Sequence, residues 1–128
     1  MSIRIKNKEQ IEGIRKSSRL AAETLKYLET FAVAGNTTEF INQKAHEFII
    51  SHGAKPATLN YNKFPKSICT SVNEVVCHGI PGPYVLKDGD ILNIDVTTIL
   101  NGYYGDTCKM FPIGKISEEA QNLIDATK

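Results

Sequence analysis

The stretch NIDVTTILNGYYGDT, residues 93–107, decides the fold and raises the functional question. Two β-prone runs flank the pair Asn101-Gly102, which in this setting is the strongest local signal for a β-hairpin with a two-residue turn. Each predicted strand carries an aspartate, Asp95 or Asp106, although strands tend to exclude aspartate. The sequence therefore predicts a hairpin with two acidic side chains that need a physical reason.

The turn also predicts the pairing register. With Asn101-Gly102 as the loop, Thr97 lies opposite Asp106. Because side chains alternate between the faces of a sheet, Asp95, Thr97 and Asp106 then share one face, with the two aspartates as diagonal neighbours roughly 7–8 Å apart. The opposite face is predicted to be core and carries Leu92, Ile94, Val96 and Leu100.

Two interpretations of the acidic pair follow from the residues alone. Two carboxylates on one face repel unless a cation or a shared proton intervenes, and paired divalent metal ions are commonly held in this way. Alternatively, the face is solvated and its acidic residues protect an edge strand from unwanted pairing. The hairpin pattern leaves both interpretations open.

Two amphipathic helices are predicted before the hairpin, over residues 8–32 and about 38–52. Asn7 with Gln10 resembles a capping pair for the first helix, and Thr37-Thr38 offers a cap for the second. The inward face of the first helix is predicted as Ile11, Ile14, Ser18, Ala21, Leu25, Leu28 and Ala32. That of the second is predicted as Ile41, Ala45, Phe48 and Ile49.

The rest of the chain completes an α+β pattern. Short strands are predicted at 67–71 and 75–78, and Ser117 is placed to cap a further helix. Helices followed by an antiparallel sheet favour one layer of helices covering one sheet face. We expect a single domain over residues 1–128.

Composition narrows the function classes. The net charge of +1 gives no reason to expect nucleic acid or an anionic membrane as a partner. The chain lacks the apolar run of a signal peptide or of a membrane span. Cys69, Cys77 and Cys108 form an odd set without metal-knuckle spacing, which predicts reduced thiols in a cytoplasmic protein, with Cys77 and Cys108 partly buried.

A second concentration of functional residues is VVCHGIPGP, residues 75–83. His78 precedes a rigid Gly-Pro turn that would fix its imidazole as a metal ligand, proton donor or electrophile, or simply as a hydrogen-bonded loop histidine. We expect structural roles for His46 and His52. Core positions or a pocket lining are predicted for Tyr61, Phe64 and Cys69.

Two segments, FPKSICTSVNEVVCHGIP (64–81) and DGDILNIDVTTILNGYYGDTCKMFPIG (88–114), resemble the first half of the methionine aminopeptidases of the short bacterial-type class. The resemblance extends over nearly the whole chain. It implies half of a pita-bread fold, in which two pseudo-symmetric α+β halves surround a dinuclear metal site. It also implies a cytoplasmic enzyme that removes the initiator methionine from nascent proteins when the second residue is small.

The resemblance assigns expected roles residue by residue. Asp95 and Asp106 match two of the family's metal ligands, for two divalent ions of Co, Mn, Fe or Zn. His78 matches the histidine that contacts the substrate backbone near the scissile bond. The expected lining of the substrate pocket is Thr58, Tyr61, Phe64 and Cys69, with Thr97 beside the metals.

The chain also departs from the family pattern, because the remaining ligands, one histidine and two glutamates, belong to the family's second half. Activity of the chain alone is therefore an open expectation. The expected partners are N-terminal methionyl peptides of nascent chains near the ribosome. The family is typically monomeric. The alternative is an inactive homologue that serves as a binding or homodimeric assembly module and buries the sheet edge that a second half would cover.

Overall fold

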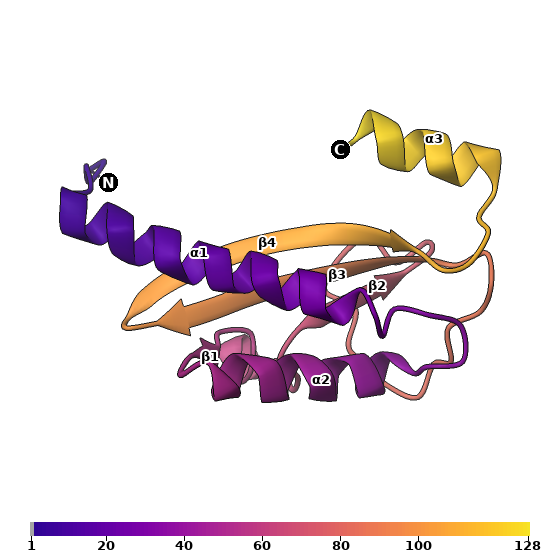
Figure 1. The fold of residues 1–128 in the computed structure, drawn as a ribbon, viewed down its shortest axis with the longest axis horizontal. Coiled ribbons are helices and arrows are strands. Elements are labelled where there is room, and N and C mark those ends of the chain that lie inside the picture. Colours follow the sequence, from indigo (N-terminus) through magenta and orange to yellow (C-terminus); the bar gives the residue numbers. More distant parts are fainter. Residues whose placement is uncertain (1) are drawn as a thin grey trace.

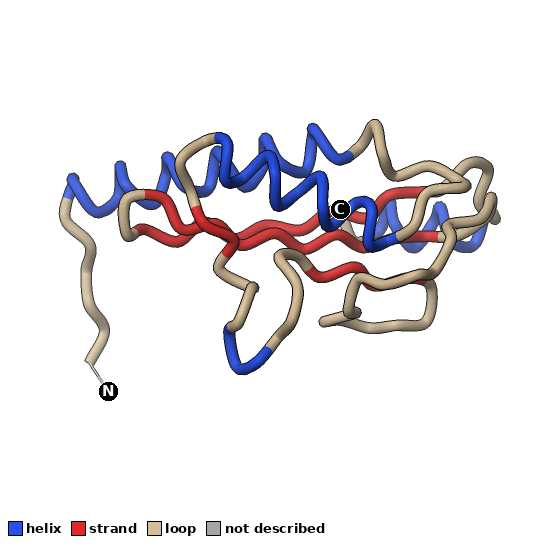
Figure 2. Tube along the Cα trace, turned by 90° about the horizontal axis from the view of Figure 1, so that it is seen from below, coloured by secondary structure: helices blue, strands red, loops and turns tan. Residues whose placement is uncertain are grey.

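The computed structural model describes residues 2–128 and places helices on one face of a four-stranded antiparallel sheet (Figures 1 and 2). The elements in chain order are α1 (Lys8–Leu28), α2 (Thr38–Ser51), β1 (Lys55–Pro56), the 3-10 turn η1 (Tyr61–Lys63), β2 (Cys69–Val72), β3 (Ile91–Leu100), β4 (Tyr103–Pro112) and α3 (Glu118–Ala126). Strand β3 is central, with β4 along one edge and both β1 and β2 along the other. The predicted α+β fold is confirmed.

The hairpin of β3 and β4 has the predicted turn and register. Asn101 and Gly102 have φ angles of 51° and 82°, the left-handed conformations that a tight hairpin turn of this class requires. Asp95 pairs with Cys108, and Thr97 pairs with Asp106. The sheet therefore has an apolar face toward the helices and a polar face on the opposite side.

The helix starts agree with the predicted caps. Gln10 N donates to Asn7 Oδ1 over 2.8 Å, and Asn7 N donates to Gln10 Oε1 over 3.0 Å, which completes a capping box. Thr37 caps α2 by accepting from Phe40 N, and Ser117 caps α3. Across residues 2–128, none of the helices has the length and apolarity needed to span a membrane.

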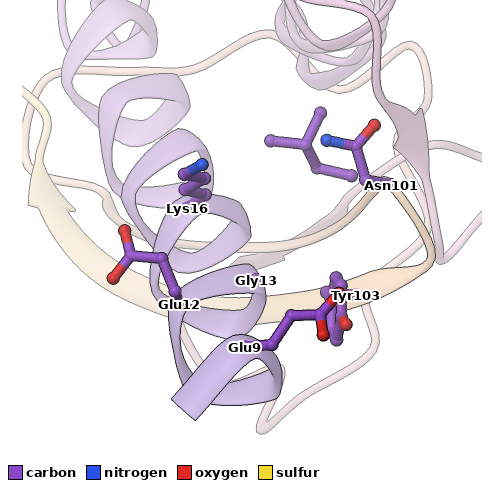
Figure 3. A pocket seen from close by; sticks show the side chains of 7 residues that line it. Glu9, Glu12, Gly13, Lys16, Asn101 and Tyr103 are labelled. Atoms are coloured by element: carbon purple, nitrogen blue, oxygen red, sulfur yellow. The ribbon is translucent and has the colours of Figure 1, made fainter.

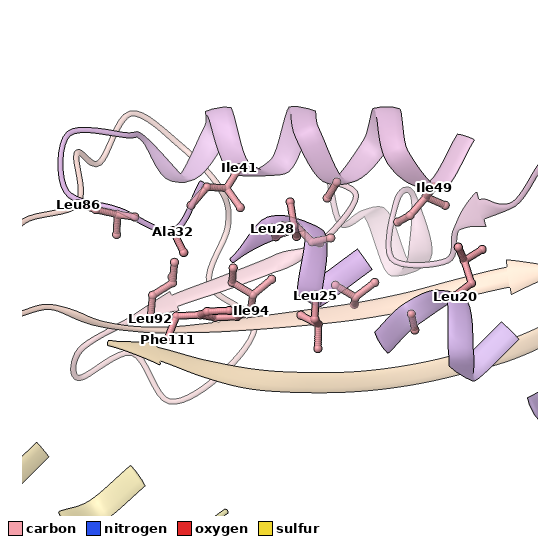
Figure 4. Packing of buried hydrophobic residues seen from close by; sticks show 14 of the residues in the cluster. Leu20, Leu25, Leu28, Ala32, Ile41, Ile49, Leu86, Leu92, Ile94 and Phe111 are labelled. Carbon is pink, nitrogen blue, oxygen red and sulfur yellow. The ribbon is translucent and has the colours of Figure 1, made fainter. Parts of the chain in front are cut away.

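The core lies between the sheet and the two helices that cover it (Figure 4). Leu28 of α1, Ile41 and Ile49 of α2, and Ile94 of β3 are fully buried there. Burying a side chain of this size stabilises the fold by roughly 1.5–3 kcal/mol. The predicted inward faces therefore hold in outline.

Two details of α1 differ from prediction. Ser17, not Ser18, is buried, and Ile11 is 44% exposed because the first turns of α1 extend past the hairpin tip (Figure 1). The helix also ends at Leu28 rather than at residue 32. Phe31 N and Ala32 N both donate to Leu28 O, which closes the helix in a turn.

Helix α1 and the hairpin approach each other most closely at Gly105. A Cβ at this position would lie 2.3 Å from Ser17 C and from Ser18 N, both backbone atoms. Beside this contact, Thr98 Oγ1 donates to Ser17 O over 2.9 Å, and the two buried hydroxyl oxygens lie 2.9 Å apart. Only glycine at position 105 allows the helix to dock at this depth.

The segment 75–78 was predicted as a strand and is a loop. Asn73 and His78 have positive φ angles of 53° and 55°, and Val75 N turns back to Val72 O, so the extended pattern is interrupted at both ends. Val76 is 93% exposed as a result. The predicted partial burial of Cys77 and Cys108 is also wrong, because both are exposed.

We predict that Gly105→Ala destabilises the protein by about 3 kcal/mol, because the added methyl forces the α1 backbone away from the sheet. Urea unfolding at neutral pH measures the effect. Gly82→Ala is the matched control, since a Cβ there meets only Ile80 O at 3.9 Å and Gly82 has no positive φ. Equal stability of the two variants would contradict the close-contact argument.

Candidate metal centre

A pocket of about 700 Å³ is lined by residues on the polar face of the sheet. Figure 2 shows that α1 and α2 lie along the opposite face of the strands. The floor of the pocket comes from β2, β3 and β4, and its walls come from the loop around η1 and the loop after β2. It brings together all eight predicted site residues: Thr58, Tyr61, Phe64, Cys69, His78, Asp95, Thr97 and Asp106. Tyr61 lines the pocket as a 70% exposed side chain and is not core.

The acidic pair lies on the pocket floor. Asp95 is half-buried and Asp106 is exposed, and Thr97 Oγ1 donates to Asp106 Oδ1 over 3.0 Å. Burial, followed by the negative charge of Asp106, raises the pKa of the Asp95 carboxyl above its usual range, against a smaller opposing influence of His78. A divalent cation between the two carboxylates would relieve this repulsion.

Cys69 occupies the neighbouring position in the same row of the sheet, since β2 pairs it with Asp95. The thiol is buried, and burial together with the charge of Asp95 raises the pKa of Cys69 to about 11. At neutral pH the side chain is therefore a protonated thiol. It contributes an apolar surface to the pocket and is poorly suited to ligate a metal as a thiolate.

His78 is held at the pocket wall by its neighbour Gly79. Gly79 N donates to Ser71 Oγ over 3.1 Å, and Gly79 O accepts from Thr70 N over 2.9 Å. A Cβ on Gly79 would come within 2.0 Å of Thr70 O, so no other residue fits this approach. The loop is thereby fixed to β2, with the His78 side chain exposed on the pocket side.

Asp90 fixes the other end of this loop. Its carboxylate is buried and accepts from Asn73 Nδ2, Tyr84 OH and Lys87 N, at 3.0, 2.9 and 2.9 Å. Burial alone would raise the pKa of Asp90, but these hydrogen bonds outweigh it, and the net pKa lies below the usual value. The loop that carries His78 is thus tied to the start of β3.

The two other histidines lie away from the pocket, as predicted. His46 Nδ1 lies 2.8 Å from Ser67 Oγ, and His52 Nδ1 lies 2.8 Å from Phe48 O. The first contact joins α2 to the segment before β2, and the second lies at the C-terminal end of α2 itself, so both are structural.

The side chains of the pocket offer some, but not all, of the ligands that a divalent cation needs. Asp95 and Asp106 supply oxygen ligands, which suit hard or borderline divalent ions. Within residues 2–128, no group of three or more His, Cys, Asp or Glu side chains is arranged to hold a metal ion. On their own, Asp95 and Asp106 would therefore supply only part of a coordination shell.

Comparison with known families identifies the family of the chain. The sequence profile of metallopeptidase family M24 matches residues 12–128, which include both aspartates, His78 and the entire pocket lining. The chain belongs to metallopeptidase family M24. Its sheet and helices are those of one half of the pita-bread fold of this family.

Relatives in the M24 family agree in sequence and in structure. The methionine aminopeptidase of Rickettsia prowazekii is 49% identical over 127 residues, which are 99% of this chain and 49% of the relative. Its crystal structure matches with a TM-score of 0.97 over 98% of this chain and 51% of that chain. The Thermotoga maritima methionine aminopeptidase matches at 32% identity and a TM-score of 0.95 over 98% of this chain and 51% of that chain. The chain spans about half the length of these relatives.

Six residues that line the M24 pocket escaped the sequence analysis: Ala57, Asn62, Lys63, Pro65, Ile80 and Tyr104. The sequence could have predicted Tyr104 as a pocket residue, because strand alternation places it on the same face as Asp106. The others belong to loops, whose course no periodicity reveals. Asn62 and Lys63 both have a left-handed φ, of 47° and 67°. This conformation costs a residue with a Cβ roughly 1–2 kcal/mol, and asparagine tolerates it better than lysine does.

A second hollow, of about 300 Å³, lies between the start of α1 and the hairpin tip (Figure 3). Gly13 makes room for the Tyr103 ring, since a Cβ there would lie 2.3 Å from Tyr103 Cδ2. None of the predicted site residues lines this hollow. It results from how the helix crosses the hairpin.

We predict that Asp90→Asn lowers the stability of the protein at pH 7 by about 2 kcal/mol, because hydrogen bonds to a charged acceptor are lost. The native pKa of Asp90 is lowered, so its contribution is complete above the unfolded pKa of roughly 3.9 and is lost as pH falls through the native pKa. The gap between variant and wild type should therefore narrow below about pH 4. Urea unfolding across pH measures this, and a gap that stays constant would contradict it.

Proposed function

We propose that this chain forms the metal- and substrate-binding part of a methionine aminopeptidase. The substrate would be a nascent protein with an N-terminal methionine followed by a small residue. The observation that carries the proposal is the pair Asp95 and Asp106 on the floor of a pocket that also holds His78 and an apolar wall. The names of the matched M24 relatives support it.

Asp95 and Asp106 are the residues that would hold divalent metal, as two ions of Co, Mn, Fe or Zn with further ligands from outside the described residues. When bound, such ions lower the pKa of water and polarise the scissile carbonyl. Thr97 would keep the Asp106 carboxylate in position through its 3.0 Å hydrogen bond. Without the cation, burial and, after it, repulsion from Asp106 raise the pKa of Asp95 and so favour its protonation.

The remaining pocket residues would bind and orient the peptide. Tyr61, Phe64 and Cys69 offer the apolar surface that a methionine side chain prefers, and Thr58 adjoins them. The neutral thiol of Cys69 suits this role. His78, fixed by Gly79, would hydrogen-bond the substrate backbone beside the bond to be broken.

The natural setting in this proposal is the cytoplasm, near the ribosome, where N-terminal methionyl peptides first appear. Some curated relatives carry mitochondrial names, such as methionine aminopeptidase 1D of Homo sapiens at 46% identity over 127 residues. The same chemistry would serve in either compartment.

We predict weak Mn²⁺ binding by the 128-residue chain, reduced at least tenfold, or about 1.4 kcal/mol, by Asp95→Asn or Asp106→Asn. Isothermal titration with MnCl₂ measures it. Asp125→Asn is the control, because Asp125 is exposed on α3 and bonds only Gln121 among the described residues. An equal loss in the control, or no Mn²⁺ binding by the wild type, would remove the metal-site proposal.

Because Asp95 and Asp106 would supply only part of the metal ligands, we predict that this chain alone hydrolyses Met-Ala-Ser slowly or not at all. Release of free methionine, followed with Mn²⁺ present, reports this. Rapid turnover that Asp95→Asn abolishes would mean that the two aspartates suffice without further ligands.

A second candidate function is assembly without catalysis, favoured by one specific observation. Strand β4 pairs only with β3 among the described strands, so its ten-residue outer edge is open, and α3 buries none of its residues. Exposed strand edges tend to pair with other chains. A homodimer through this edge would cover it.

Light scattering coupled to size exclusion distinguishes the two candidates. Self-association predicts a mass that rises toward twice 14.2 kDa with concentration. A mass that stays at the monomer value at all concentrations would exclude the homodimer, and the peptidase proposal would be the one that remains.

A further inference from the structure

The wall of the pocket formed by the loop around η1 contains an unusual backbone. Asn60, Asn62 and Lys63 all have positive φ, at 67°, 47° and 67°. Asparagine tolerates the left-handed region, whereas lysine is rare there and glycine would fit without strain. A side chain kept at a strained position beside a pocket is grounds for a functional hypothesis.

Lys63 also brings a positive charge to the pocket. Among the described residues that line the pocket, Lys63 is the only lysine or arginine. Ion pairs between the described residues involve Arg15, Lys44, Lys66 and Lys109, and none involves Lys63. Lys66, three residues later, is by contrast paired with Glu39. The Lys63 ammonium therefore has no ion-pair partner among the described residues and is free to meet a ligand in the pocket.

The position of Lys63 indicates which part of a ligand it meets. The residue is exposed, and η1 projects from the sheet on the pocket side (Figure 2). Cys69 and Asp95, in contrast, belong to the strands of the floor. A peptide whose methionine side chain contacts Tyr61 and Phe64, as proposed above, would then bring its later residues past Lys63, which lies between those two residues in the chain.

We propose that Lys63 is a specificity residue, which favours methionyl peptides bearing a carboxylate after the first residue. This inference rests on the function proposed above, and it names a substrate class within it. The carboxylate has two possible sources, an acidic side chain or the free C-terminus of a short peptide. An exposed ion pair of this kind is weakened by salt.

The test is isothermal titration of the 128-residue chain with three peptides in the presence of Mn²⁺. Met-Ala-Asp amide carries the side-chain carboxylate, Met-Ala-Asn amide is its neutral isostere, and Met-Ala-Asn free acid carries the terminal carboxylate. We expect Met-Ala-Asp amide, the free acid, or both to bind about threefold tighter than the neutral peptide at low salt, as exposed pairs allow, and the preference to fade at high salt.

Variants separate charge from backbone strain. Lys63→Gln should remove the preference, Lys63→Arg should retain it, and Lys115→Gln, at an exposed lysine outside the pocket, should leave it unchanged. Lys63→Gly should also remove the preference while raising the urea midpoint above that of Lys63→Gln, because glycine relieves the left-handed strain.

The outcomes are distinct. Equal binding of all three peptides by the wild type, or a preference that survives Lys63→Gln, overturns the role of Lys63 and leaves the peptidase proposal standing. No gain in urea midpoint for Lys63→Gly overturns the premise of a retained strain. No binding of any methionyl peptide overturns the proposed function of this chain and the inference with it.

Discussion

The register of the β3–β4 hairpin is the constraint on which the core and the candidate site both depend. Asn101 and Gly102 adopt left-handed conformations, so the loop has two residues and Thr97 meets Asp106. Side chains alternate along each strand, and a slip of one residue would turn Asp95 toward α1 and expose Ile94 to water. Core packing and carboxylate placement thus enforce the same alignment.

Close packing on the helix side fixes the floor of the pocket on the other side. Gly105 lets the α1 backbone lie directly on β4, one residue before Asp106, and Thr98 hydrogen-bonds Ser17 one residue after Thr97. The residues that hold the helix thus alternate with the residues that face the pocket. The face that carries Asp95 and Asp106 therefore rests on a rigid support, which a site that must place charged ligands requires.

What the sequence could predict is what local chemistry encodes. The hairpin register, the three helix caps and the acidic pair follow from turn and capping rules that act within a few residues. The residues alone also marked His78 as a candidate and offered Tyr61, Phe64 and Cys69 as core or pocket lining. Only the family resemblance placed them in one site with the aspartates, because no periodicity connects them. Their common pocket depends on how the loops after β1 and β2 fold back over the sheet.

The loop at 75–78 was misread because Val75 and Val76 look like strand residues, whereas the left-handed Asn73 and His78 break the strand. Burial of Ser17 in place of Ser18 depends on the crossing of α1 over the hairpin, which no local rule sets.

The contact between Ser17 and Thr98 joins residues 81 positions apart in the chain. Contacts of such long range form late, because the entropy of closing the intervening loop must be overcome before the contact contributes. During synthesis, α1 leaves the ribosome well before β3 and β4 exist. Its apolar stripe, with Leu20, Leu25 and Leu28, then has no sheet to cover it. The nascent chain therefore passes through a stage in which this apolar stripe is exposed to water, until translation has completed the hairpin.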